Sequence, residues 1–95
     1  MSIIEIQEKI SPILRAYGIK KASIFGSVSR GDERPDSDVD LLVELGRPMD
    51  LYAYIDLQDE IEKKLQKKVD LITNKSLNKF IAPYILQELK TIYEG

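Results

Sequence analysis

Three short apolar segments occur at residues 22–25, 39–45 and 69–73, and segments with helical periodicity lie between them. Apolar runs of this length, bounded by glycine, aspartate and lysine, are typical of buried strands rather than buried helices. Strands that alternate with helices along a chain favour one sheet backed by helices. The sequence therefore predicts an α/β (α+β) fold with a single small mixed sheet of three to four strands.

Two long segments carry apolar residues at the spacing of one helix face. They are residues 2–17 and residues 49–65. Proline lacks a backbone N–H and disrupts a helix interior, so Pro12 is expected to kink the first helix or to restart it with Ser11 as a local N-cap. We therefore expect two helices on the sheet, the first of them interrupted.

The glycine-rich middle and the C-terminal quarter are less regular. Residues 26–37 are rich in Gly, Ser, Asp and Pro and are expected to form a turn, a short helical piece and a loop. Residues 76 to about 88 are helical in outline, with Pro83 beginning a second segment. Residues 89–93 either extend that helix or form a last edge strand, and we favour the strand.

Size and charge define the class of molecule. A chain of 95 residues with 43% hydrophobic and 32% charged residues is expected to form one compact domain, residues 1–95. It holds no apolar run of the roughly 20 residues that span a bilayer, and residues 1–10 lack the pattern of a signal peptide. We therefore expect a cytoplasmic protein without membrane contact. A net charge of −2 argues against strong nucleic-acid binding.

Two residue types are missing from the chain. The sequence contains no cysteine and no histidine. This excludes disulfides, thiol nucleophiles, zinc–thiolate sites and every mechanism that uses histidine as a base. The chemistry must therefore use carboxylates, lysine, arginine, hydroxyls and backbone amides.

Three aspartates occur at strand positions. Asp38 and Asp40 open the segment 39–45, and alternating strand side chains place them on one face, roughly 6–7 Å apart at the backbone. Asp70 lies in the segment 69–73 and joins that face if the two strands are neighbours in the right register. Two converging carboxylates are costly to ionise without a cation, and oxygen ligands suit Mg²⁺ or Mn²⁺. The alternative is a solvated strand start.

A glycine turn directly follows the first apolar segment. Gly26 permits close approach of the backbone to a phosphate, and the next helix start offers free N–H groups. Ser27 adds a hydroxyl, and Arg30 adds a planar set of donors suited to phosphate. The alternative is an ordinary strand–turn–helix corner. The P-loop motif is excluded because Asp32, not lysine, follows Gly31.

Together these pieces resemble the DNA polymerase β-like nucleotidyltransferase superfamily. The resemblance is closest to the minimal nucleotidyltransferases, which are the antitoxins of toxin–antitoxin pairs whose toxin is a helical HEPN-domain ribonuclease. It is carried by FGSVSRG at residues 25–31, SDVDLLVE at 37–44, Asp70, and IAPYI at 81–85. The combined pattern covers nearly the whole chain and is specific, although no single piece is.

The resemblance implies a reaction and a set of roles. The family's usual reaction is adenylylation from ATP, with a tyrosine hydroxyl of the toxin as acceptor in toxin-linked members. Gly26 and Ser27 would hold the triphosphate, helped by Arg30. Asp38, Asp40 and Asp70 would be the catalytic residues that bind two Mg²⁺ ions, with Mn²⁺ as a substitute, and Asp70 would serve the metal nearest the acceptor.

Other functions stay open at this stage. The chain could neutralise a toxin mainly by binding and occlusion, or act on a small molecule or an RNA end. The lysines at 63, 64, 67 and 68 favour the last function, but lysines at a helix end also complement its dipole. The sequence leaves open the acceptor, the NTP, the number of transfers and whether copies associate into a homo-oligomer.

Overall fold

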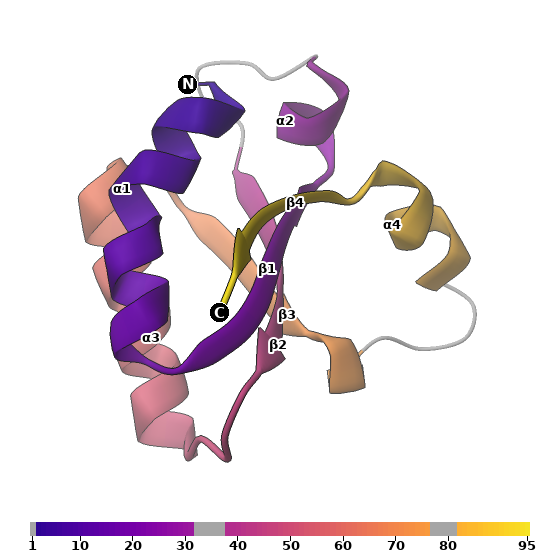
Figure 1. The fold of residues 1–95 in the computed structure, drawn as a ribbon. Coiled ribbons are helices and arrows are strands. Elements are labelled where there is room, and N and C mark those ends of the chain that lie inside the picture. Colours follow the sequence, from indigo (N-terminus) through magenta and orange to yellow (C-terminus); the bar gives the residue numbers. More distant parts are fainter. Residues whose placement is uncertain (1, 32–37, 77–81) are drawn as a thin grey trace.

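The computed structural model describes residues 2–31, 38–76 and 82–95. Its centre is one mixed sheet in the order β3-β2-β1-β4, in which β1 is antiparallel to both of its neighbours and β2 is parallel to β3 (Figure 1). This confirms the predicted fold class, with the C-terminal segment as an edge strand. The strands are β1 (Ile19–Phe25), β2 (Val39–Leu45), β3 (Val69–Thr73) and β4 (Lys90–Glu94).

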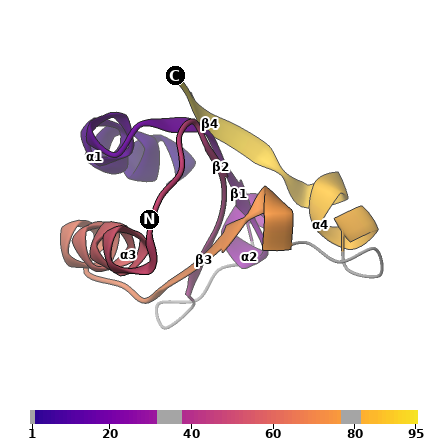
Figure 2. The ribbon, with the colours of Figure 1, turned by 90° about the horizontal axis from the view of Figure 1, so that it is seen from below.

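Two helices cover one face of the sheet. They are α1 (Ile3–Ala16) and α3 (Leu51–Leu65), whereas the short α4 (Ala82–Glu88) lies on the other side (Figure 2). Fully buried side chains from the two long helices meet alternate residues of the strands and form the core. The largest of these side chains are Ile6, Ile10, Leu14, Ile24, Leu41, Leu57, Ile61, Val39 and Val43. No helix within the described ranges is long and apolar enough to cross a bilayer.

α1 is one helix that runs through Pro12, so the predicted restart is wrong. Ser2 is the true N-cap and accepts a hydrogen bond from the Glu5 amide at 3.1 Å. The Ser11 hydroxyl instead donates to the carbonyl of Gln7 at 2.5 Å. Side chains on both sides of the proline are buried, so packing on the sheet maintains the helix despite one missing hydrogen bond.

α3 begins two residues later than the sequence predicted. Asp50 caps its start by accepting a hydrogen bond from the Ala53 amide at 2.7 Å, and Gln66 ends it in the left-handed conformation with φ 56°. This is the usual role of aspartate at an N-cap.

The remaining elements are short. α2 (Ser27–Arg30) follows the glycine turn, and a 3₁₀ turn, η1 (Asn74–Ser76), follows β3. The helical outline predicted for residues 76–88 thus contains a 3₁₀ end and α4, with Pro83 in the first turn of α4. Part of that prediction, residues 77–81, lies outside the described residues, as do residues 32–37 of the predicted loop.

Candidate active site

The three aspartates predicted as metal ligands occur at neighbouring positions of the sheet. Asp40 in β2 and Asp70 in β3 are register partners in a parallel pair, and Asp38 precedes β2 by one residue. Val39, Leu41 and Val43 of β2 are buried in the core under α1 and α3. Side chains alternate along a strand, so Asp40 faces the opposite side, which is free of the two long helices.

The Asp40 carboxyl is strongly affected by its surroundings. Burial, followed by the negative charges of Asp70 and Asp38, raises the pKa of the Asp40 carboxyl from 3.8 to about 6. Arg30 opposes this rise, and Glu88 adds a smaller one. A half-buried carboxylate among other carboxylates is therefore costly to ionise without a nearby cation.

The donor set fits a hard divalent metal ion in its chemistry. Carboxylate oxygens are the ligands preferred by Mg²⁺ and Mn²⁺, and a cation beside Asp40 would offset the burial and the negative charges that raise its pKa. In the part of the chain that the structure describes, no three acidic side chains are already gathered closely enough to hold a metal ion. The roles of Asp38, Asp40 and Asp70 as ligands therefore stay predictions.

Gly26 lies directly against Asp40. Its φ is +77°, a conformation that favours glycine, and a Cβ built on it would lie 2.1 Å from Asp40 Oδ2. The preceding residue, Phe25, is the cross-strand partner of Asp40. The sequence predicted a close approach of this glycine to a phosphate, whereas here the close approach is to a carboxylate of the site.

The two other residues assigned to the nucleotide belong to α2. Ser27 is the first residue of this helix, but its side chain lies outside the described part of the structure. Arg30 is the last residue, and its guanidinium forms an ion pair with Glu88, with 2.6 Å between Nη1 and Oε1. Arg30 is thus close to the aspartates but already engaged by a carboxylate.

Glu88, at the end of α4, is a residue of this site that the sequence did not reveal. Its Oε2 accepts a hydrogen bond from the Gly26 amide at 3.0 Å, and its Oε1 accepts one from Arg30. Its backbone carbonyl accepts a hydrogen bond from the Ser29 hydroxyl. These partners lie 58 to 62 residues away in sequence, so no local pattern could have indicated them.

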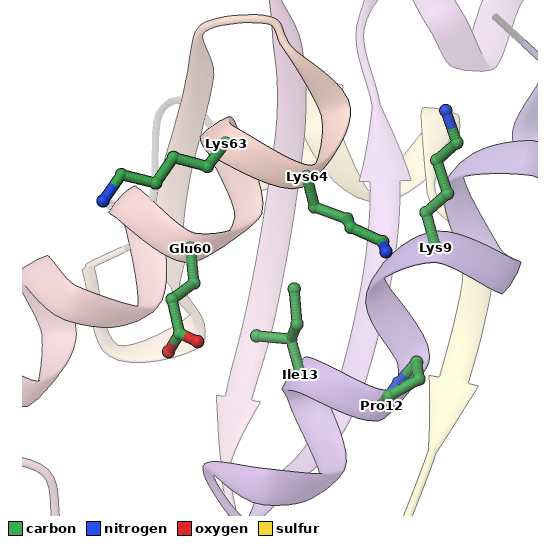
Figure 3. A pocket seen from close by; sticks show the side chains of 6 residues that line it. All are labelled: Lys9, Pro12, Ile13, Glu60, Lys63 and Lys64. Carbon is green, nitrogen blue, oxygen red and sulfur yellow. The ribbon is translucent and has the colours of Figure 1, made fainter.

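A separate groove of about 440 Å³ lies between α1 and α3 (Figure 3). Three lysines and Glu60 line it together with Pro12 and Ile13. Lys63 and Lys64 lie in the last turn of α3, where cations complement the helix dipole. Because the groove is on the helix-covered side of the sheet, it is remote from Asp40 and does not belong to the candidate active site.

One protein family matches most of the chain. The family described as Polymerase beta, Nucleotidyltransferase matches residues 8–95 of the chain. Proteins of this family generally use divalent metal ions.

Two curated relatives match nearly the whole chain. A protein of Methanocaldococcus jannaschii, provisionally named a protein adenylyltransferase, is 43% identical over 88 residues, which are 93% of this chain and 95% of the relative. Protein adenylyltransferase MntA of Thermococcus cleftensis is 36% identical over 90 residues, which are 86% of this chain and 91% of the relative.

A solved structure supports the fold. It is that of a tri-AMPylated HEPN toxin of Shewanella oneidensis in complex with an MNT antitoxin. The TM-score is 0.75 at 21% identity, and the match covers 98% of this chain and 73% of the other. At this identity the likeness establishes the fold alone.

Proposed function

The chain belongs to the polymerase beta nucleotidyltransferase family, and on that premise we propose that it transfers AMP from ATP to a tyrosine hydroxyl of a HEPN-domain toxin. It is then the antitoxin of the pair. The observation that carries the proposal is the Asp40–Asp70 register pair, with the glycine turn packed against Asp40. The names of the relatives, which are protein adenylyltransferases, supply the choice of AMP and of a protein acceptor.

The three aspartates would hold the metal. Asp38, Asp40 and Asp70 would bind divalent ions, for which we propose two Mg²⁺ with Mn²⁺ as a substitute, and bound there these would supply positive charge at the triphosphate and at the acceptor oxygen. The Asp70 carboxylate would accept the proton of the acceptor hydroxyl, since the chain has no histidine to do so.

The glycine turn and α2 would serve the other end of the reaction. Ser27 and Arg30 would donate hydrogen bonds to the departing pyrophosphate, because a guanidinium and a hydroxyl both match phosphate oxygens. Gly26 would act indirectly by leaving space for the Asp40 carboxylate.

The test is the loss of transfer without loss of fold. The double variant Asp38→Asn/Asp40→Asn is expected to transfer no AMP from labelled ATP to the cognate toxin, and EDTA is expected to stop the wild type. Asp59→Asn is a matched control, because Asp59 is exposed on α3, which covers the face of the sheet opposite Asp40. Transfer of AMP at the wild-type rate by the double variant, or in excess EDTA, would show that the reaction does not depend on these aspartates or on a metal ion.

Two other functions remain as outcomes of the same assay. Toxin neutralisation that persists in the double variant would favour an antitoxin that works by binding and occlusion. Transfer to a small molecule or an RNA end, with none to the toxin, would favour a different acceptor. The cytoplasmic location and the lack of strong nucleic-acid binding stay predictions from the sequence, and the oligomeric state stays open.

A further inference from the structure

We propose that Glu88 is a positioning residue of the active site, which holds the glycine turn and Arg30 in the arrangement that nucleotide binding requires. The proposal rests on the proposed function, because it assigns the held segment to the triphosphate. Three hydrogen bonds from this segment converge on Glu88, two on its carboxylate and one on its backbone carbonyl.

The sheet register explains why Glu88 meets Gly26. Ile24 of β1 pairs with Lys90 of β4 in an antiparallel ladder. Continued by two residues, that ladder would place Glu88 opposite Gly26. At Glu88, however, the chain is still in α4, and the carboxylate accepts the Gly26 N–H in place of a backbone carbonyl. The side chain therefore completes the ladder at the end of β1.

In the sheet, Glu88 and the predicted metal ligands lie beside different neighbours of β1. β1 lies between β2 and β4, so Asp40 is on one side of the strand end and Glu88 is on the other. Glu88 therefore accepts the hydrogen bond of the Gly26 N–H on the β4 side of the turn, whereas the aspartates lie on the β2 side. We infer that it supports the turn rather than occupying the place of a phosphate.

The carboxylate also fixes the far end of α2. Its second oxygen binds Arg30, so one side chain joins the residue before this four-residue helix to the last residue within it. A helix this short has few internal hydrogen bonds and depends on outside contacts for its placement. The Ser29 hydroxyl adds a bond to the Glu88 carbonyl and fixes the backbone from which the carboxylate reaches.

The charge of Glu88 matters because it orients Arg30. Arg30 Nη1 lies 2.6 Å from Glu88 Oε1, which is the distance of a charge-assisted hydrogen bond. A planar guanidinium held in this way has a defined position next to the glycine turn. Glu88 thus fixes the orientation of the cation that the proposed function assigns to the pyrophosphate.

The experiment compares Glu88→Gln and Glu88→Ala with Glu94→Ala. Glu94 is an exposed glutamate at the other end of β4 and serves as the control. The readouts are the Kd of a non-hydrolysable ATP analogue with Mg²⁺, KM and kcat for ATP, and the thermal unfolding midpoint. Glu88→Gln retains an acceptor for Gly26 but loses the charge, so a rise in Kd and KM of about 3- to 10-fold is expected at a nearly unchanged midpoint.

Glu88→Ala removes both bonds, and its Kd is expected to rise by about 10- to 100-fold, while Glu94→Ala stays at the wild-type value. A Glu88 variant that is folded and binds the analogue as tightly as the wild type, or more tightly, would overturn the proposal. In the double variant Arg30→Gln/Glu88→Gln the losses should not add, since both residues act through one ion pair. Additive losses would count against it.

These readouts also separate the two proposals. If the wild type binds the ATP analogue but transfers nothing to the toxin, the proposed function fails. The effect of Glu88 on analogue affinity would still be measured in that case.

Discussion

Gly26 and Gly31 have the same backbone conformation in different surroundings. Both have φ +77°. A Cβ at Gly26 would lie 2.1 Å from Asp40 Oδ2, whereas a Cβ at Gly31 would have no atom within 4 Å. The two glycines flank α2, so they differ mainly in whether a side chain would collide with the candidate metal site. Alanine substitutions at the two positions therefore distinguish the cost of a positive φ from the cost of a contact with Asp40.

Gly31→Ala is expected to cost about 1–2 kcal/mol of folding free energy through its positive φ and to keep transfer near the wild-type level. Gly26→Ala carries the same cost and must also displace the Asp40 carboxylate. Transfer by the folded Gly26 variant should therefore fall much further. Urea unfolding and AMP transfer per folded molecule provide the measurements. Equal loss of transfer in the two variants would show that Gly26 has no special relation to Asp40.

The Asp40 carboxyl makes stability depend on pH. Its pKa is raised from 3.8 to about 6, so the folded state favours the protonated form. Below the unfolded-state pKa the group is protonated in both states and costs nothing. As the pH rises from the unfolded-state pKa through 6, the carboxyl ionises first in the unfolded state and then in the folded state. The free energy of unfolding falls over this range, because the folded state is the poorer environment for the charged carboxylate.

Asp40→Asn is therefore expected to stabilise the metal-free protein by about 1–3 kcal/mol at pH 8 and to have little effect below pH 4. Urea unfolding in EDTA at the two pH values measures this difference. Asp59→Asn, on the solvent side of α3, is the control variant in the same measurement. A stability gain for Asp40→Asn that is the same at both pH values would mean that ionisation of Asp40 is not its cause.

At the scale of elements, the sequence predicted most of the fold from periodicity. The bounds of β2 and β3 were predicted correctly because each is a short apolar run between polar residues. β1 is three residues longer than predicted. Its first residue, Ile19, is buried, but Lys20 and Lys21 interrupt the apolar pattern between it and Ala22. The pairing of β1 with two neighbours extends the strand across these lysines.

Two features depended on tertiary structure and could not be predicted locally. α1 continues through Pro12 because buried residues before and after it pack on the sheet, an effect that propensity alone does not contain. Glu88 reaches the site because β4 pairs with β1 in one particular register. In contrast, Asp40 and Asp70 are adjacent as soon as their two strands are parallel neighbours in the right register. The sequence predicts this adjacency only under that condition, and the β2–β3 pair meets it.

At the scale of the molecule, the sheet divides the protein into two sides. α1 and α3 cover one face, and α4 lies on the other (Figure 2). The candidate active site is on the side of α4, because Asp40 alternates with the core residues of β2 and Glu88 of α4 binds the Gly26 amide. This second side carries exposed apolar residues of α4, Tyr84 at 74% and Leu86 at 57% exposure. A protein acceptor must approach from the side of the aspartates, so modification and binding of a toxin would use the same side of the molecule. The contributions of modification and of binding to toxin neutralisation must therefore be distinguished by the ratio of antitoxin to toxin that neutralisation requires.

An antitoxin that modifies its toxin acts catalytically, whereas one that occludes it is consumed one for one. With ATP and Mg²⁺, the wild type is expected to abolish the ribonuclease activity of the cognate toxin at concentrations far below that of the toxin. Asp70→Asn removes a predicted metal ligand on an exposed strand position and should keep the fold. It should neutralise the toxin only at equal concentration, or not at all.

The measurement is toxin activity against antitoxin concentration, with and without ATP, for the wild type, Asp70→Asn and the control Asp59→Asn. A wild-type curve that ends at equal concentration whether or not ATP is present would mean that occlusion is the mechanism. The three aspartates would then need another explanation. A curve that moves to low antitoxin concentration only when ATP is present, and only while Asp70 is intact, requires turnover at this site, because no binding equilibrium allows one molecule to silence many.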